Sequence, residues 1–350
     1  MKFCIYLKQT EPEVSFSSEE HIFPAGIGGI QKLPIDFVSH DCNNSFSAME
    51  LKFMRNSLIS LDRQFYGPGK RGKLNPRNAS KSTVCLMTDV NDQNSVELGY
   101  VSLGQPYNIL QVLINKSGVC RFKTDRSHGE INEQLDIFMK SLEKYDGKYV
   151  LYEDERFSED EFVLGYHEGK WYVALSNKDF EGKIIGFVKM LIHQKPLKSH
   201  PPQYKTVQKE VMQTLTFDDS HFRVCAKIMF NYLAFAKGQD FVLNSCFDEL
   251  RDWIVKGGEN KFALLIGEEL RLPISFPKFA HKLVVIQDGR SLRGCISFYG
   301  EAFTTQVNLC ESYEGFFEMD GFICDWKNKR EYFMSDYILQ ITKKMHCGLS

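Results

Sequence analysis

No two of the ten cysteines in this chain are spaced as Cys-x-x-Cys, so the paired-thiol motif of zinc and redox sites is missing. No stretch approaches the roughly 18 consecutive apolar residues of a membrane span. The N-terminus "MKFCIYLKQTEPE" has neither a basic leader nor an apolar stretch of signal-peptide length. These absences predict a cytoplasmic protein with reduced thiols and no membrane partner.

The chain also has no excess of basic charge. Its 43 Lys and Arg residues face 45 Asp and Glu residues, which gives a net charge of −2. This balance argues against a general nucleic-acid coat protein and leaves room only for a local basic patch. There is no internal repeat, no low-complexity tract and no phosphate-binding loop of the form G-x-x-x-x-G-K-[ST].

The chain has 350 residues, which is long enough for two domains, and its mixture of helix and strand patterns predicts an α+β protein. Periodicity breaks in "YGPGKRGKLNPRNASKST", which is rich in glycine, proline and basic residues. We therefore expect a small domain at 1–66, a basic linker or loop at 67–83, and a larger α+β domain at 84–350 that recognises a target, oligomerises or senses a signal.

Local patterns predict the main elements. Cap residues and apolar spacing predict a helix from about residue 43 and two more, within 218–237 and 244–256. Apolar runs and alternation predict strands at 2–7, 35–39, 82–90, 107–115, 147–153, 183–192, 281–289, 292–300 and 302–310, and a hairpin across 162–176.

The segment "SSEEHIFPAGIGG" holds the residues best suited to catalysis. Phosphodiester hydrolysis needs a base that activates water and a cation that stabilises charge on the phosphate. Glu20 can bind the cation while His21 takes the proton. Because neighbouring side chains of a strand point to opposite faces, a shared site requires the backbone to bend at the glycine-rich turn.

A further ligand is expected from the following helix. In "CNNSFSAMELKF", Asn43 and Glu50 are separated by almost two helical turns and share a face. Oxygen donors of this kind suit Mg²⁺ or Mn²⁺. Two structural alternatives remain open, namely that Asn43 caps the helix and that Glu50 lies on its solvated face.

The segments "EEHIFPAGIGG" and "CNNSFS", with Cys42 placed 13 residues after Gly29, resemble the HNH nucleases, in particular the subgroup with "EHI-P---GG" and "CN--F". The resemblance covers residues 1–66. It implies a ββα-metal unit in which His21 is the general base, Glu20 and Asn43 bind the metal, and Glu50 is an additional ligand or supports the ligands. It also implies a DNA endonuclease, with restriction, anti-phage defence or a mobile element as its setting.

The chain departs from that family at the cysteine pairs that often flank the site. The four cysteine positions of that family correspond here to Cys4 and Leu7 in the first pair and to Ser39 and Cys42 in the second. Two of the four thiolates are therefore missing, and a four-thiolate zinc site is not available. A reduced site of Cys4, Cys42 and His40 competes here with plain apolar packing. The family's middle asparagine has no clear match near Pro34 and Asp36.

Basic residues near the site are candidates for contacts with DNA phosphates. These candidates are Arg55, Arg63, Lys70, Arg71 and Lys73. The alternative for the loop is a solvated linker. RNA remains an alternative substrate, homo-oligomerisation stays open, and a non-catalytic DNA- or partner-binding protein that retains an HNH scaffold is the rival hypothesis.

Overall fold

The computed structural model of the protein describes residues 2–68, 79–115, 117, 120–125, 129–177, 181–194, 207–266, 275–300 and 303–347. The chain divides into two compact units. We call Met1–Ser80 with Leu215–Ser350 the main unit, and Lys81–Thr214 the inserted unit. Among the described residues, no helix has the length and apolar character needed to cross a membrane.

This division differs from the expected one, in which residues 1–66 stand apart from 84–350. The N-terminal segment shares one hydrophobic core with the C-terminal segment. Aromatic rings show the contact directly, since Tyr6 lies 5.1 Å from Phe230 and Phe53 lies 5.4 Å from Phe298. The main unit is interrupted after Ser80, which lies within the predicted linker at 67–83. The chain then forms the inserted unit and returns to the main unit at Leu215.

The main unit is built on an antiparallel sheet with strand order β10-β13-β12-β11-β14-β15. Its strands are β10 (Ala263–Ile266), β11 (His281–Asp288), β12 (Ser291–Ser297), β13 (Thr304–Cys310), β14 (Asp320–Asp325) and β15 (Arg330–Phe333). Its helices are α1 (His40–Asn56), α2 (Ile59–Tyr66), α5 (Asp219–Lys237), α6 (Gln239–Val242), α7 (Asp248–Lys256) and α8 (Met334–Cys347).

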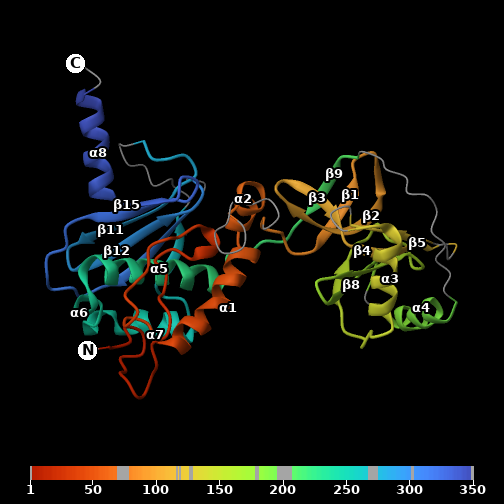
Figure 1. The fold of residues 1–350 in the computed structure, drawn as a ribbon, viewed down its shortest axis with the longest axis horizontal. Helices are drawn as coiled ribbons and strands as arrows, with labels where there is room; N and C mark the ends of the chain where they lie inside the picture. Colours follow the sequence, from red (N-terminus) through yellow and green to blue (C-terminus); the bar gives the residue numbers. More distant parts are fainter. Residues whose placement is uncertain are drawn as a thin grey trace. The chain divides into compact units, whose positions relative to one another are not determined.

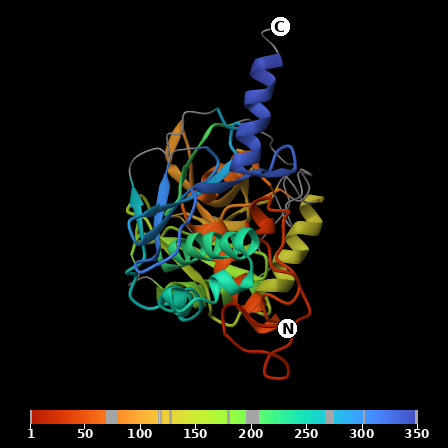
Figure 2. The ribbon, with the colours of Figure 1, turned by 90° about the vertical axis from the view of Figure 1, so that its left-hand side faces the viewer.

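Different helices contact the two faces of this sheet: α5 lies along one face, whereas α8 contacts the other face near its start and then extends away from the sheet (Figures 1 and 2). Side chains alternate along β11, so Leu283 and Val285 join the core around α5, whereas Val284 joins a smaller cluster with Ile338 of α8. Helix α5 lies along the sheet, and it also packs against α1 and α7. It is therefore the central element of the main unit.

Among the residues that the structure describes, the inserted unit contains two sheets and two helices. One sheet has the order β3-β2-β1-β9, and the other has the order β5-β4-β7-β8-β6, in which only β6 and β8 pair in parallel. The strands are β1 (Cys85–Asp89), β2 (Asp92–Ser102), β3 (Gln105–Asn108), β4 (Leu110–Ile114), β5 (Cys120–Lys123), β6 (Val150–Glu153), β7 (Phe162–His167), β8 (Lys170–Leu175) and β9 (Lys209–Met212). The helices are α3 (Ile131–Leu142) and α4 (Glu181–Gln194).

The mixed α+β class is confirmed, as are helices α5 and α7, the hairpin of β7 and β8, and strands β11, β12 and β13. The strand expected at 183–192 is wrong, because these residues form α4. Ile184, Val188 and Leu191 recur at helical spacing and are buried on one face of the helix. This helical periodicity outweighs the strand preference of the β-branched residues in the segment.

The strands expected at 2–7 and 35–39 are also wrong. Phe3 and Ile5 donate backbone hydrogen bonds to the carbonyls of Asp36 and Phe37, so the two segments lie side by side. Turns interrupt both segments, and the only bridge within them joins Phe3 to Thr10 among the residues that the structure describes.

Candidate functional site

The segment around His21 forms a short hairpin. Ile22 donates to the carbonyl of Gln31 at 3.0 Å, Leu33 donates to that of Glu20 at 2.7 Å, and His21 is bridged to Lys32. A 3₁₀ turn at Ala25–Ile27 closes it. At Gly29 a Cβ atom would lie 1.8 Å from the carbonyl oxygen of Phe23, so this close approach requires glycine.

Glu20 points into the main unit, where it is only 5% exposed. Its Oε1 forms an ion pair with Lys227 Nζ, and the same ammonium lies 2.6 Å from Oε1 of Glu50 in α1. Both predicted carboxylate ligands are thus brought together, but around a lysine of α5. Burial raises the pKa of Glu20, against the lowering effect of Lys227.

His21 is only half-buried. Its carbonyl accepts a 2.9 Å hydrogen bond from the Asn231 side chain of α5, and the Asn231 amide oxygen accepts one of 2.6 Å from Tyr6. Burial lowers the pKa of His21, and the positive charges of Lys32 and Lys227 lower it further. The imidazole is therefore neutral at pH 7 and able to accept a proton.

Asn43 lies in the first turns of α1 and faces the hairpin. Its Nδ2 donates to Ser18 Oγ at 3.0 Å and to the carbonyl of Glu19 at 3.4 Å. The N-cap position of α1 belongs to Ser39, so the alternative of Asn43 as a helix cap does not hold. Asn43 instead ties the helix to the residues that directly precede Glu20 and His21.

Three of the four positions that the HNH resemblance assigns to flanking cysteines also meet. The backbone N–H of Ser39 donates to the sulfur of Cys4 at 3.4 Å, and Ser39 Oγ lies 3.4 Å from the same sulfur. A hydrogen bond from Cys42 outweighs burial and lowers the pKa of Cys4 to about 5. His40 bonds instead to Ser17 and Asn44 through its two ring nitrogens, so it is no partner for a reduced zinc site.

The basic residues expected to contact DNA have different surroundings. Arg55 is exposed in the last turn of α1. Arg63 is only 8% exposed, and its Nε donates to the carbonyl of Gly26 at 3.0 Å, so it supports the hairpin turn from inside. Lys70, Arg71 and Lys73 lie outside the described residues.

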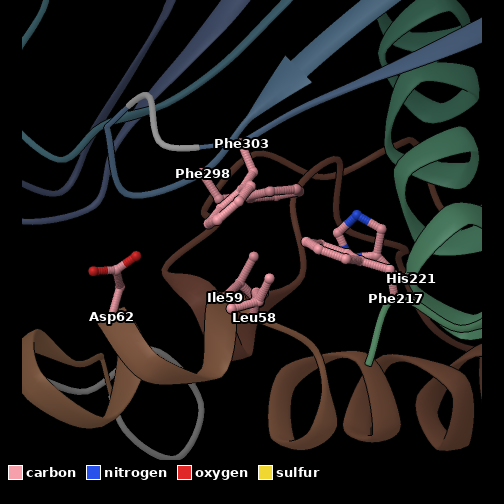
Figure 3. A pocket seen from close by; sticks show the side chains of 7 residues that line it. All are labelled: Leu58, Ile59, Asp62, Phe217, His221, Phe298 and Phe303. Carbon is pink, nitrogen blue, oxygen red and sulfur yellow. The ribbon is translucent and has the colours of Figure 1, made fainter. Parts of the chain in front are cut away.

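A small apolar cavity lies between the start of α2, the start of α5 and the sheet (Figure 3). At about 10 Å³ it has room for no more than a single water. Burial lowers the pKa of His221 in its wall to about 4. The cavity contains none of the predicted site residues in its lining. It is lined by Leu58, Ile59, Asp62, Phe217, His221, Phe298 and Phe303.

Lys227 and Asn231 are the residues of this site that the sequence analysis does not identify. Both side chains are fully buried, and they are four residues apart on one face of α5. The sequence feature that could have indicated them is a lysine and an asparagine four residues apart within an otherwise apolar helix. Such residues are rarely buried without a partner.

Within the described ranges, no group of three or more His, Cys, Asp and Glu side chains is arranged to hold a metal ion. Glu20, Glu50 and Asn43 carry oxygen donors of the kind that magnesium and manganese prefer, but the two carboxylates meet at the ammonium of Lys227. The class that fold and geometry define is an α+β protein with a buried, charged site between a hairpin and two helices. No family model, curated protein or solved structure matches the chain.

Proposed function

We propose that residues 18–56 form a metal-dependent nuclease site of the HNH type, which hydrolyses phosphodiester bonds in DNA. The observation that carries this proposal is the hydrogen bonding of Asn43, in α1, to Ser18 and Glu19 directly before Glu20 and His21. These bonds support a site shared by the hairpin and the helix. The meeting of Cys4, Ser39 and Cys42 supports the same resemblance.

In this proposal His21 is the general base. Its half-buried ring is neutral at pH 7, so one ring nitrogen can take a proton from an attacking water. Asn231 fixes the backbone of His21 through its carbonyl, which limits the motion of the ring. The nearby positive charges of Lys32 and Lys227 favour this neutral form.

A divalent cation, Mg²⁺ or Mn²⁺, would be held by the oxygens of Glu20 and Asn43, with Glu50 as a further donor. When bound, it would supply positive charge opposite the negative charge that develops on the phosphate. Of the predicted phosphate contacts that the structure describes, Arg55 at the end of α1 is the exposed one, and we assign it this role. Restriction or anti-phage defence is the biological setting that fits such an enzyme.

A second candidate function is favoured by Lys227. Its ammonium already neutralises Glu20, and both side chains are almost completely buried. If this lysine takes the place of the metal, the chain is a DNA- or partner-binding protein on a nuclease-like scaffold. Cleavage would then be absent, and binding would be unaffected by a chelator.

The experiment is cleavage of supercoiled plasmid, single-stranded DNA and RNA with Mg²⁺ or Mn²⁺. We expect His21→Ala to abolish nicking, while His193→Ala, which removes an exposed histidine of α4, cuts like the wild type. Equal nicking by His21→Ala and wild type, or none by either on DNA, would refute the proposal, and cleavage of RNA alone would reassign the substrate. Calorimetry with Mn²⁺ separates the two candidate functions. If the wild type binds Mn²⁺ and Glu20→Gln does not, the metal site of a nuclease is supported. If neither the wild type nor Glu20→Gln gives a binding heat, the non-catalytic binding protein is supported.

A further inference from the structure

Lys227 is the most deeply buried charge that contacts the proposed site. It lies in the middle of α5, its side chain is 0% exposed, and its ammonium lies 5.2 Å from the centre of the Phe46 ring. Placing an ammonium in such surroundings is unfavourable unless it is paired and hydrogen-bonded. Both requirements are met by Glu20 and Glu50.

The contacts of Lys227 join segments that are distant in sequence. Glu20 comes from the hairpin and Glu50 from the middle of α1, whereas Lys227 follows Glu20 by 207 positions. One ammonium within hydrogen-bond reach of both Oε1 atoms fixes the separation and the orientation of the two carboxylates. The Oε2 atom of each carboxylate takes no part in these ion pairs.

We propose that Lys227 is a positioning residue of the nuclease site, which holds the carboxylates of Glu20 and Glu50 in place for the metal. This inference rests on the proposed function. Partners that orient metal-binding carboxylates change metal affinity strongly although they do not touch the metal. The ammonium is out of reach of a phosphate because it is fully buried, so its role is exerted through the two carboxylates.

The two roles open to Lys227 predict opposite results for Lys227→Met. As a positioning residue, its loss releases the carboxylates, and the Mn²⁺ concentration for half-maximal nicking rises about 10- to 100-fold. The rate at saturating Mn²⁺ is largely kept. As a replacement for the metal, its loss would open a cation site, and Mn²⁺ would bind more tightly than to the wild type.

The experiment measures nicking rate against Mn²⁺ concentration, together with Mn²⁺ calorimetry, for wild type, Lys227→Met and Lys227→Arg. The arginine variant keeps the charge and is expected to recover most of the affinity. Lys209→Met is the matched control, since it removes a nearly buried lysine paired with Glu97 in the inserted unit and leaves the Mn²⁺ dependence unchanged. If Lys227→Met does not fold, Lys227→Gln keeps two N–H donors and is expected to raise the Mn²⁺ requirement by a smaller factor.

A merely structural role for Lys227 would lower the rate without changing the Mn²⁺ dependence. An unchanged or tighter Mn²⁺ dependence in a folded Lys227→Met or Lys227→Gln variant, with an active wild type, would overturn this inference alone. A wild type that neither binds Mn²⁺ nor cuts would overturn the proposed function, and this inference with it.

Discussion

His281 allows a prediction about pH whose sign follows from two hydrogen bonds. It is the first residue of β11 and is fully buried. The backbone N–H of Tyr299 donates to its Nδ1 at 3.1 Å, so Nδ1 carries no proton, and Nε2 donates to the carbonyl of Ile27 at 2.9 Å. Protonation would put a hydrogen on Nδ1 opposite the Tyr299 N–H and leave a charge in the core.

This arrangement lowers the pKa of His281 from 6.5 to about 4, chiefly through burial. The unfolded chain therefore binds a proton at a higher pH than the folded one, and stability falls as the pH drops from about 6.5 towards 4. With these pKa values, the contribution of His281 to the loss of unfolding free energy between pH 7.5 and pH 5 is about 2 kcal/mol.

The assay is urea unfolding followed by tryptophan fluorescence in a Trp171→Phe background. This leaves Trp253 and Trp326, both in the main unit, as reporters. His281→Asn can keep an acceptor for Tyr299 but does not titrate, so we expect it to lose about 2 kcal/mol less than its parent over this range. His221 titrates in both proteins and cancels. Equal losses would refute the assignment of the neutral ring.

Three further predictions follow from the same structure. Chelation by EDTA should abolish nicking, because it removes the cation of the proposed site; nicking that persists in EDTA would contradict a metal-dependent site. Gly29→Ala should destabilise the main unit by about 1–3 kcal/mol in the same urea assay, through its clash with the Phe23 carbonyl; an unchanged stability would contradict this close approach. A fragment of residues 1–80 should lack the near-ultraviolet circular dichroism of a packed core, and adding 215–350 in trans should restore it; a folded isolated fragment would contradict the shared core.

The elements predicted correctly from sequence have strong local signals. The Asp218 side chain accepts from the His221 backbone at the start of α5, and Gly238 ends the helix with a φ of 88°. Glu168 and Gly169 adopt φ values of 46° and 80° in the turn between β7 and β8. Caps and tight turns depend on a few neighbouring residues, so a single sequence contains the information that specifies them.

Where the chain returns to the main unit could not be predicted in this way. Residues 1–66 have a glycine turn, an apolar helix and a following basic loop, which are the local marks of a separate domain. Their buried side chains nevertheless pack against residues beyond Leu215. Apolar burial is non-directional, and no local pattern indicates which distant segment will cover a given face.

The same limit explains why the candidate site was only half predicted. The hairpin and α1 contribute Glu20, His21, Asn43 and Glu50, whose chemistry can be recognised from their spacing. The group that brings the two carboxylates together is Lys227, which comes from the segment after the inserted unit. A buried lysine opposes the local preference of an apolar helix, and such conflicts between local preference and overall fold are expected at functional sites. The contacts of Lys227 with Glu20 and Glu50 can therefore form only when both segments of the main unit have folded together.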